Sequence, residues 1–206
     1  MNEVPDFHGI DERGREVLDF MPGRIVDVDR EVLTDAQLVA TATWTRRLHE
    51  STGSFTDSGP WRFAGPSEAN LIGHNDIAPY NICFDGDVLV GVFDWDLSGP
   101  TTALLELGFI AWNCVPLYRR PDVDDPDAYA AARLHLLASA YGGVDASDVL
   151  AATLSRTEYT ITAMQVAAAA GDIGMQGLME TTGEPGPTRR ALNQLRSRVP
   201  NIEDWL

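Results

Sequence analysis

The segment HNDIAPYN, residues 74–81, places a histidine, a carboxylate and an amide within eight positions. The apolar run that follows it, NICFDGDVLVGVF (81–93), contains an Asp-Gly pair that predicts a tight turn between two antiparallel strands. Because such a hairpin brings its open ends together, we expect Asn81, which enters the hairpin, to lie beside Asp94, which leaves it. Asp76, in the preceding loop, should lie at the same end.

Three oxygen-bearing side chains placed in this way suit phosphoryl transfer to a hydroxyl. Mg²⁺ prefers one or two carboxylates together with waters and substrate phosphates, so we expect Asn81 and Asp94 to be metal ligands. Asp76 is then the catalytic residue, which accepts or orients the proton of the acceptor hydroxyl. The alternative is a polar turn, because Asp and Asn favour turns. The combined pattern, His-x-Asp-x-x-x-x-Asn followed by a hairpin and a second Asp, favours the catalytic interpretation.

The segments around this loop predict a little strand and a mostly helical body. Residues 15–20 (REVLDF) read as a short strand that ends before 21–23 (Met-Pro-Gly). Thr34 and Gln37 have the spacing of a capping box, so a helix should begin there and run to Glu50. Four further helices are expected from their apolar periodicity and end signals, over residues 102–114, 125–141, 147–170 and 188–199.

The composition restricts the class of partner. The chain has 206 residues and a formal net charge of −16, which repels a phosphate backbone and disfavours nucleic-acid binding, while a cationic small substrate would be attracted. No apolar run reaches membrane-spanning length, and the N-terminus is charged rather than apolar, so we expect a cytoplasmic protein without a membrane partner. Two cysteines, Cys83 and Cys114, make neither a disulfide framework nor a zinc set.

The sequence resembles the aminoglycoside phosphotransferase and choline kinase-like family over residues 4–118. HNDIAPYN matches the family's His-Gly-Asp-x-x-x-x-Asn loop, and VFDWDLSGP matches its Ile-Asp-Trp metal motif. ALLELGFIAWNCVPLY is similar to a segment that usually contains Asp-Leu-Ala, and VPDFHGIDERGREVLDFMPG to the last strands and hinge of the nucleotide lobe. The resemblance implies an α+β, protein kinase-like fold and an ATP- or GTP-dependent phosphotransferase that uses Mg²⁺ and acts on a small-molecule hydroxyl.

The resemblance implies the same catalytic and metal-binding roles for the loop and hairpin residues, and it adds others. His74, Asp96 and Glu106 would support the site structurally, with Glu106 at a position where the family usually has Asp. Asn75 replaces the usual Gly of the loop. The hinge backbone would meet the adenine ring through Asp19, Phe20 and Met21.

The resemblance also implies a divided chain with a truncated N-terminal lobe. Residues 1–23 would be the remnant of the nucleotide lobe and hinge, and residues 24–206 the mainly helical catalytic lobe. No Gly-rich loop and no phosphate-binding lysine precede the hinge, and the 15 basic residues are all Arg. We therefore expect weak nucleotide binding and slow or absent turnover in this short form. The strand at 15–20 should have an unpaired edge, which favours a homodimer through the N-terminal segment.

Two other functions are consistent with the same residues. One is a non-catalytic, kinase-like protein that binds a small molecule or a nucleotide. The other is a metal-dependent phosphoesterase with His74, Asp76 and Asp94 as ligands, although such a site normally needs more His or carboxylate ligands. The acceptor is left open among aminoglycosides, choline-like amines, sugars and macrolides. Three acidic residues near the C-terminus are candidates to receive a cation or simply form a solvated face: Glu158, Glu180 and Glu184.

Overall fold

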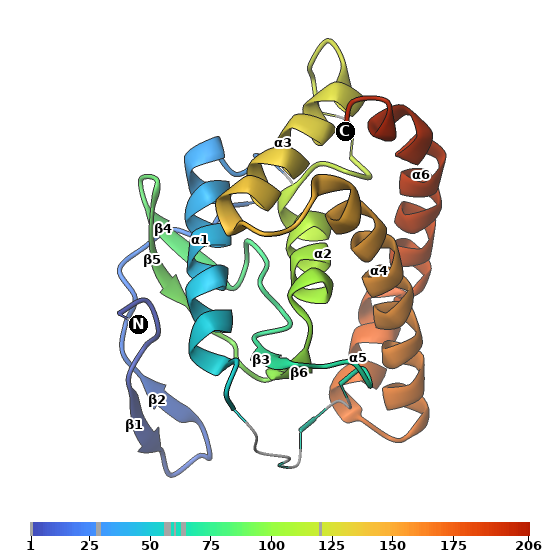
Figure 1. Ribbon diagram of the computed structural model, residues 1–206. Helices are drawn as coiled ribbons and strands as arrows, with labels where there is room; N and C mark the ends of the chain where they lie inside the picture. The colour runs from blue at the N-terminus through green and yellow to red at the C-terminus, as the bar shows by residue number, and fades with distance from the viewer. Residues whose placement is uncertain (1, 28–29, 56–58, 60, 63–64, 120) are drawn as a thin grey trace.

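The computed structural model describes residues 2–27, 30–55, 59, 61–62, 65–119 and 121–206. It confirms the α+β class: in this part of the chain, three two-stranded antiparallel sheets accompany a body of helices (Figure 1). The strands are β1 (Phe7–Ile10), β2 (Glu16–Leu18), β3 (Leu71–Gly73), β4 (Ile82–Asp85), β5 (Val88–Val92) and β6 (Gly99–Thr101). The helices are α1 (Asp35–Thr52), α2 (Ala103–Cys114), α3 (Pro126–Tyr141), α4 (Ala146–Ala169), α5 (Ile173–Thr182) and α6 (Gly186–Glu203).

Helix α1 begins at the predicted capping box. The hydroxyl of Thr34 accepts a hydrogen bond from the Gln37 N–H at 3.1 Å, and the Gln37 side chain accepts one from the Thr34 N–H at 3.0 Å. The Gln37 amide also donates to the Gly86 carbonyl at 2.9 Å, which ties the start of the helix to the turn of the β4–β5 hairpin. Leu38 and Trp44 are buried on the face of α1 that packs against α3 and β5. This contact fixes the hairpin on the helical body.

Helix α2 lies at the centre of the molecule, as its apolar composition predicted (Figure 1). Its residues Leu107, Ile110 and Ala111 are fully buried, and the helix packs mainly against α4. Gly108 allows this close approach, because a Cβ atom there would lie 2.7 Å from the Ala152 backbone of α4. The small residue therefore sets the spacing between the two helices that carry much of the candidate site.

A buried arginine joins the last helix to the rest of the core. Arg198 of α6 is 3% exposed, and its guanidinium pairs with Asp127 at 2.6 Å. The same group donates to the carbonyls of Pro116, Arg119 and Pro126 at 2.9–3.0 Å. A buried charge is tolerated when it is paired and fully hydrogen-bonded, so this residue holds α6 to the segment between α2 and α3. In the described part of the chain, no helix has both the length and the apolar character needed to span a membrane.

The β4–β5 hairpin is confirmed, but its turn lies one residue later than predicted. Asp85 pairs with Val88, so the two-residue loop is Gly86–Asp87, and Gly86 has a φ of 59° that suits glycine. At the open end, the Phe93 N–H donates to the carbonyl of Asn81 at 3.0 Å. The two ends of the hairpin are therefore adjacent, as expected.

Several short elements were not predicted. Helix α5 contains Gly174 and Gly177, which weaken the helical signal, and it has no buried residue to create a periodic pattern. Strands β3 and β6 have three residues each and contain Gly or Pro. The predicted strand at 15–20 is correct in type but covers only Glu16–Leu18, and the last helix is longer than predicted at both ends.

The expected open edge of the strand at 15–20 needs a partial correction. Strand β2 pairs with β1, so one side of β2 is occupied within the chain. The hairpin still exposes apolar side chains, including Phe7 and Ile10, each about 60% exposed. Glu3 anchors the segment that precedes the β1–β2 hairpin. Its carbonyl accepts a hydrogen bond from the Val92 N–H at 2.6 Å, and its carboxylate pairs with Arg47 at 2.7 Å. The homodimer stays a prediction.

The packing of α2 on α4 predicts opposite effects for the same substitution at two helical glycines. Gly108→Ala should lower the stability, because the new methyl group overlaps the α4 backbone and overpacking typically costs about 1–3 kcal/mol. Gly177→Ala in α5 has no atom within 4 Å of the new Cβ and should be neutral or stabilising by up to about 1 kcal/mol. Urea unfolding followed by circular dichroism measures both; equal midpoints for the two variants would contradict the close α2–α4 contact.

Candidate active site

The loop at residues 74–81 is fixed by its first residue. His74 is fully buried; its Nδ1 accepts a hydrogen bond from the Asp76 N–H at 3.3 Å, and its Nε2 donates to the Phe93 carbonyl at 3.1 Å. Burial lowers the pKa of His74, which suits a neutral ring with one accepting and one donating nitrogen. Because Phe93 precedes Asp94, this ring holds the loop and the end of β5 together.

Asp76 and Asn81 meet as predicted. The Asn81 amide nitrogen donates to the Asp76 carboxylate at 2.7 Å and to the Asp76 carbonyl at 3.0 Å. Since both bonds use the nitrogen, the amide oxygen of Asn81 points away from Asp76 and is available as a metal ligand. Asp94 is exposed at the end of β5 and has a φ of 65°, a left-handed conformation that is unusual for a residue other than glycine. Uncommon backbone conformations of this kind cluster at functional sites.

The environment of Asp76 raises its pKa to about 7. Burial of the carboxyl is the main cause, and the negative charge of nearby Asp94 adds to it. The hydrogen bond from Asn81 and the positive charge of Arg156 act in the opposite direction. Asn81 bonds to Asp76, and its carbonyl accepts the N–H of Phe93, the residue before Asp94, so Asn81 lies between the other two residues, as expected from the hairpin.

Asn75 sits between the histidine and the aspartate in a left-handed conformation, with a φ of 62°. Glycine or asparagine is favoured in this conformation, which explains how Asn75 occupies a position where the related sequences usually have Gly. Its side-chain nitrogen donates to the carbonyls of Gly99 at 3.1 Å and Leu97 at 3.3 Å, next to strand β6. Asn75 therefore ties the loop to the β3–β6 pair while it supplies the turn that aims Asp76.

A buried carboxylate supports the loop from below. Glu106 of α2 is completely buried and accepts a hydrogen bond from the Asn75 N–H at 2.8 Å. Its other oxygen lies 2.5 Å from Nε2 of His49, whose Nδ1 lies 2.8 Å from the Tyr141 hydroxyl. Burial by itself would raise the pKa of Glu106, but the hydrogen bonds from His49 and the Asn75 N–H, together with nearby positive charge, outweigh it and keep the pKa below the usual value. Gly73 makes room, because a Cβ atom there would lie 2.1 Å from the carboxylate.

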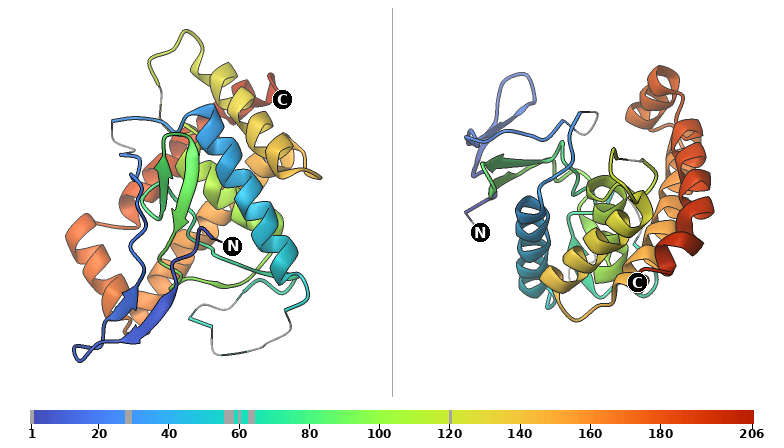
Figure 2. Two further views of the ribbon diagram at one scale, coloured as in Figure 1. Left: turned by 90° about the vertical axis from the view of Figure 1, so that its left-hand side faces the viewer. Right: turned by 90° about the horizontal axis from the view of Figure 1, so that it is seen from above.

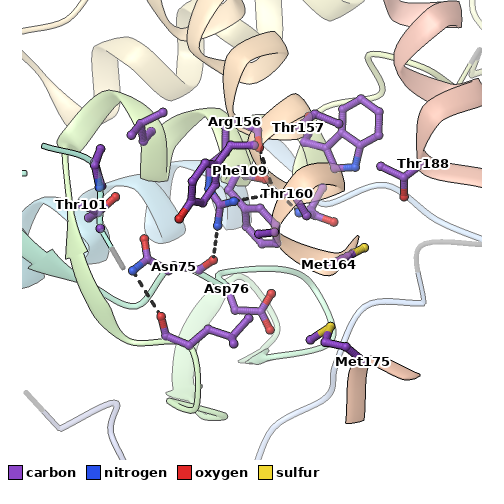
Figure 3. A pocket seen from close by; sticks show the side chains of 18 of the residues that line it. Asn75, Asp76, Thr101, Phe109, Arg156, Thr157, Thr160, Met164, Met175 and Thr188 are labelled. Carbon is purple, nitrogen blue, oxygen red and sulfur yellow. Dashed lines mark hydrogen bonds between the residues drawn. The ribbon is translucent and has the colours of Figure 1, made fainter. Parts of the chain in front are cut away.

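An arginine that the sequence analysis did not identify completes the loop. Arg156 of α4 is 9% exposed and donates to the Asn75 carbonyl at 3.0 Å and to the Thr160 hydroxyl at 2.5 Å (Figure 3). Its guanidinium also lies 4.9 Å from the centroid of the Phe109 ring. Both peptide groups of Asn75 are thus held, the N–H by Glu106 and the carbonyl by Arg156. The sequence signal available was that Arg156 is the single basic residue of the Ala- and Thr-rich helix α4, and its spacing pointed to no partner.

Asp76 faces a cavity of about 560 Å³ between the loop and the helices α2, α4 and α5 (Figure 3). Its walls include Phe109, Trp112, Met164 and Met175, with the hydroxyl groups of Thr157 and Thr160 between them. This volume lies within the range of small-molecule sites. The cavity therefore supplies space for an acceptor next to the proposed catalytic carboxylate.

The other predicted residues lie farther from Asp76. Glu106 supports the loop as described, whereas Asp96 is exposed and its carboxylate lies 3.4 Å from the Arg62 guanidinium. The hinge residues form a separate region beside the β4–β5 hairpin. Phe20 is 87% exposed and borders a hollow of about 370 Å³, Asp19 pairs with His8 at 2.6 Å, and Met21 packs beside Gly91.

The three acidic residues considered for a cationic substrate are separated. Glu184 lines the cavity, and its carboxylate accepts a bond from the Thr188 N–H at 3.3 Å. Glu158 pairs with Arg196 on the surface, and Glu180 is exposed. A second carboxylate at the cavity, Glu68, was not considered. Of the three candidates, only Glu184 lies at the cavity, whereas Glu158 and Glu180 belong to the exposed surface.

The support of the loop by Glu106 can be tested by two substitutions. Glu106→Ala leaves the Asn75 N–H and His49 without their buried partner and should cost about 3 kcal/mol, as expected for breaking a buried pair. Glu106→Gln keeps an oxygen for the N–H and an amide for the imidazole, so it should retain at least about half of that stability. Chemical unfolding measures both; a Gln variant as unstable as the Ala variant would contradict the hydrogen-bonding role.

The backbone conformation of the loop gives a second test. At Asn75, Ala should destabilise more than Gly by about 1 kcal/mol, although Gly removes more atoms, because only Gly adopts a φ of 62° without strain. Both should be less stable than the wild type, because both lose the bonds to β6. Thermal unfolding of the three proteins gives the order, and an Ala variant as stable as the Gly variant would show that the left-handed conformation is wrong.

The comparisons with known proteins agree with this geometry. Residues 60–146, which contain the loop, the hairpin and helix α2, match the sequence profile of the phosphotransferase enzyme family. The trifolitoxin immunity protein of Rhizobium leguminosarum bv. trifolii is 34% identical over 117 residues, which is 53% of this chain. The match spans only 44% of that relative.

Solved structures are similar over nearly the whole chain. An amicoumacin kinase in complex with AMP-PNP, Ca²⁺ and its ligand superposes with a TM-score of 0.61 at 13% identity, covering 95% of this chain and 72% of that one. A choline/ethanolamine kinase family protein from Mesorhizobium loti gives a TM-score of 0.52 at 15% identity, covering 95% and 78%. Residues 60–146 thus match the phosphotransferase enzyme family, and the chain has the protein kinase-like fold of aminoglycoside phosphotransferases and choline kinases.

Proposed function

We propose that this chain is a small-molecule kinase that transfers a phosphoryl group from ATP or GTP to a hydroxyl held in the cavity beside Asp76. The observation that carries the proposal is the convergence of Asp76, Asn81 and Asp94 at the open end of one hairpin. Phosphoryl transfer depends on positioning and on stabilising the charge around the phosphates, with a carboxylate that accepts or orients the hydroxyl proton. The bracing of the loop by His74 and Glu106 supplies the rigidity that such positioning needs.

The donor set fits Mg²⁺ carried by a nucleotide. The amide oxygen of Asn81 and the exposed carboxylate of Asp94 are hard oxygen ligands, and Mg²⁺ takes one or two carboxylates plus substrate phosphates. Asn81 and Asp94 would hold the ion, which would supply positive charge to offset the charge that develops on the phosphates. Because the amide nitrogen of Asn81 is bonded to Asp76, the same residue connects the metal ligands to the catalytic carboxylate. The hinge residues Asp19, Phe20 and Met21 are proposed to meet the adenine ring.

Asp76 can take the proton of the acceptor at neutral pH. A carboxyl with a pKa near 7 is a better proton acceptor than an ordinary one, and about half of it is ionised at that pH. Arg156 and Asn81 keep the carboxylate oriented through the loop backbone and the direct amide bond. His74 does not take part in the chemistry, because both of its ring nitrogens are engaged within the loop and hairpin. The same fact disfavours the phosphoesterase alternative, which needed His74 as a ligand.

The similarity to an immunity protein and to an amicoumacin kinase suggests a biological setting for this activity. One relative is named for immunity to trifolitoxin, and one structural neighbour for phosphorylating amicoumacin. We propose that this chain likewise acts on a toxic small molecule or antibiotic, which phosphorylation would inactivate.

Calorimetric titration with ATP and GTP in the presence of Mg²⁺ tests the nucleotide site. The wild-type chain should bind one nucleotide, and Asp94→Ala should weaken binding on the order of tenfold or more, because it removes the charged metal ligand. Asp122→Ala, in the exposed segment before α3, is the matched control and should bind like the wild type. If the wild type does not bind nucleotide, or if Asp94→Ala binds it as tightly as the wild type, the proposed metal–nucleotide site is wrong.

A second variant separates binding from chemistry. Asp76→Asn keeps the size of the side chain and should leave nucleotide affinity within about threefold, while phosphoryl transfer to an acceptor falls about 100-fold or more through loss of the base. Acceptor-dependent release of ADP measures the rate. If the wild type binds nucleotide but transfers no phosphoryl group to any acceptor, the alternative of a non-catalytic, kinase-like binding protein is favoured instead.

A further inference from the structure

We infer that the acceptor of this site is an uncharged, largely apolar alcohol with a ring-sized body, rather than a polycationic aminosugar. The inference rests on the proposed function, because it names the class of molecule that the cavity beside Asp76 presents to phosphoryl transfer. It is carried by the chemistry of the cavity walls.

The wall opposite the loop is apolar and polarisable. Phe109 and Trp112 come from α2, Met164 from α4, and Met175 and Leu178 from α5. Aromatic and methionine side chains suit a flat or irregular apolar ligand, because rings stack and thioethers adapt their shape. The Trp112 ring is itself held in place by Tyr118, with the two centroids 4.4 Å apart. A rigid aromatic surface is therefore available inside the cavity.

The polar groups of the cavity are mostly neutral. Thr157 and Thr160 of α4, Asn113 of α2 and Thr188 of α6 contribute hydroxyl and amide groups. Such groups orient a hydroxyl or carbonyl of a ligand without requiring a charge. They lie between the apolar side chains, so the site presents isolated polar contacts on an apolar surface, which is the usual composition of a site for a neutral small molecule.

The charges around the cavity disfavour several ammonium groups in its interior. The buried guanidinium of Arg156 forms part of the wall next to Asp76 and would repel a cation placed there. The two further carboxylates, Glu68 and Glu184, are exposed and half-buried respectively, so a cation near them would keep much of its water. An aminosugar with several charges would lose hydration against Phe109 and Met164. Its ionic partners would be limited to the three carboxylates that line the cavity, those of Asp76, Glu68 and Glu184.

The net charge of −16 does not change this conclusion. A diffuse acidic field raises the local concentration of cations near the surface, but the Debye length is only about 8 Å at physiological salt. Discrimination between acceptors depends instead on the groups that touch the ligand in the cavity, where water is excluded. Most of those groups are apolar or neutral. The charged ones are the guanidinium of Arg156 and the carboxylates of Asp76, Glu68 and Glu184.

Fluorescence titration with N-phenyl-1-naphthylamine, a neutral probe with one naphthyl and one phenyl group, tests the inference without nucleotide. We expect saturable binding with one site per chain, displaced by naphthaleneethanol and not by kanamycin at the same concentration. Ala163→Phe fills the cavity from α4 and should weaken the probe about tenfold or more. Ala151→Phe makes the same change at an exposed position of α4 that does not line the cavity and should bind like the wild type.

Two results would overturn the inference. One is probe binding that does not saturate or that survives unchanged in Ala163→Phe, which would place the probe elsewhere. The other is tighter binding of kanamycin than of naphthaleneethanol, or ADP release stimulated by kanamycin and not by the neutral alcohol. Failure of the proposed kinase activity is distinguishable, because it shows as absent Mg²⁺-nucleotide binding while the probe still reports on the cavity.

Discussion

The buried carboxylate of Glu106 is the contact on which the candidate site depends. An ionised side chain without exposure is costly unless every lone pair finds a donor, and here the Asn75 N–H and the His49 ring satisfy its two oxygens. The consequence is reciprocal. The Glu106 carboxylate can stay ionised in the core because the Asn75 N–H donates a hydrogen bond to it. The same hydrogen bond stabilises the left-handed conformation of Asn75. Tyr141 extends the same chain of contacts to α3, so three helices share in holding one peptide group.

The loop then places two carboxylates, Asp76 and Asp94, close enough for one to change the pKa of the other. Two like charges at short range oppose each other, and this cost is offset locally by the Asn81 amide and by Arg156. In the proposed function, a divalent ion held by Asn81 and Asp94 would reduce the remaining repulsion. The repulsion between Asp76 and Asp94 therefore favours binding of the metal–nucleotide complex that we propose as co-substrate.

The cavity and the outer surface differ in chemical character. The outside of the molecule is strongly acidic, while the space next to Asp76 is bounded by aromatic rings, thioethers and hydroxyl groups. Residues of helices α2, α4 and α5 line this space. The view from above shows α4 and α5 on the side of α2 away from the β1–β2 hairpin (Figure 2, right), and α5 buries none of its own residues. Its apolar side chains Met175 and Leu178 are exposed enough to meet a ligand instead of a core. A helix of this kind is useful to the protein mainly as one wall of a binding site.

The sequence by itself determined the elements whose signals are local. The spacing of Asp76, Asn81 and Asp94 around an Asp-Gly hairpin predicted their convergence, and the Thr34 capping box predicted the start of α1. Contacts between distant segments had no such signal. His49 and Glu106 are 57 positions apart, and Arg156 and Asn75 are 81 apart, so only tertiary packing decided that these residues hold the loop. The acceptor cavity was decided in the same way, because hydrogen bonds and apolar walls between helices depend on the distance at which the helices pack, which Gly108 sets for α2 and α4.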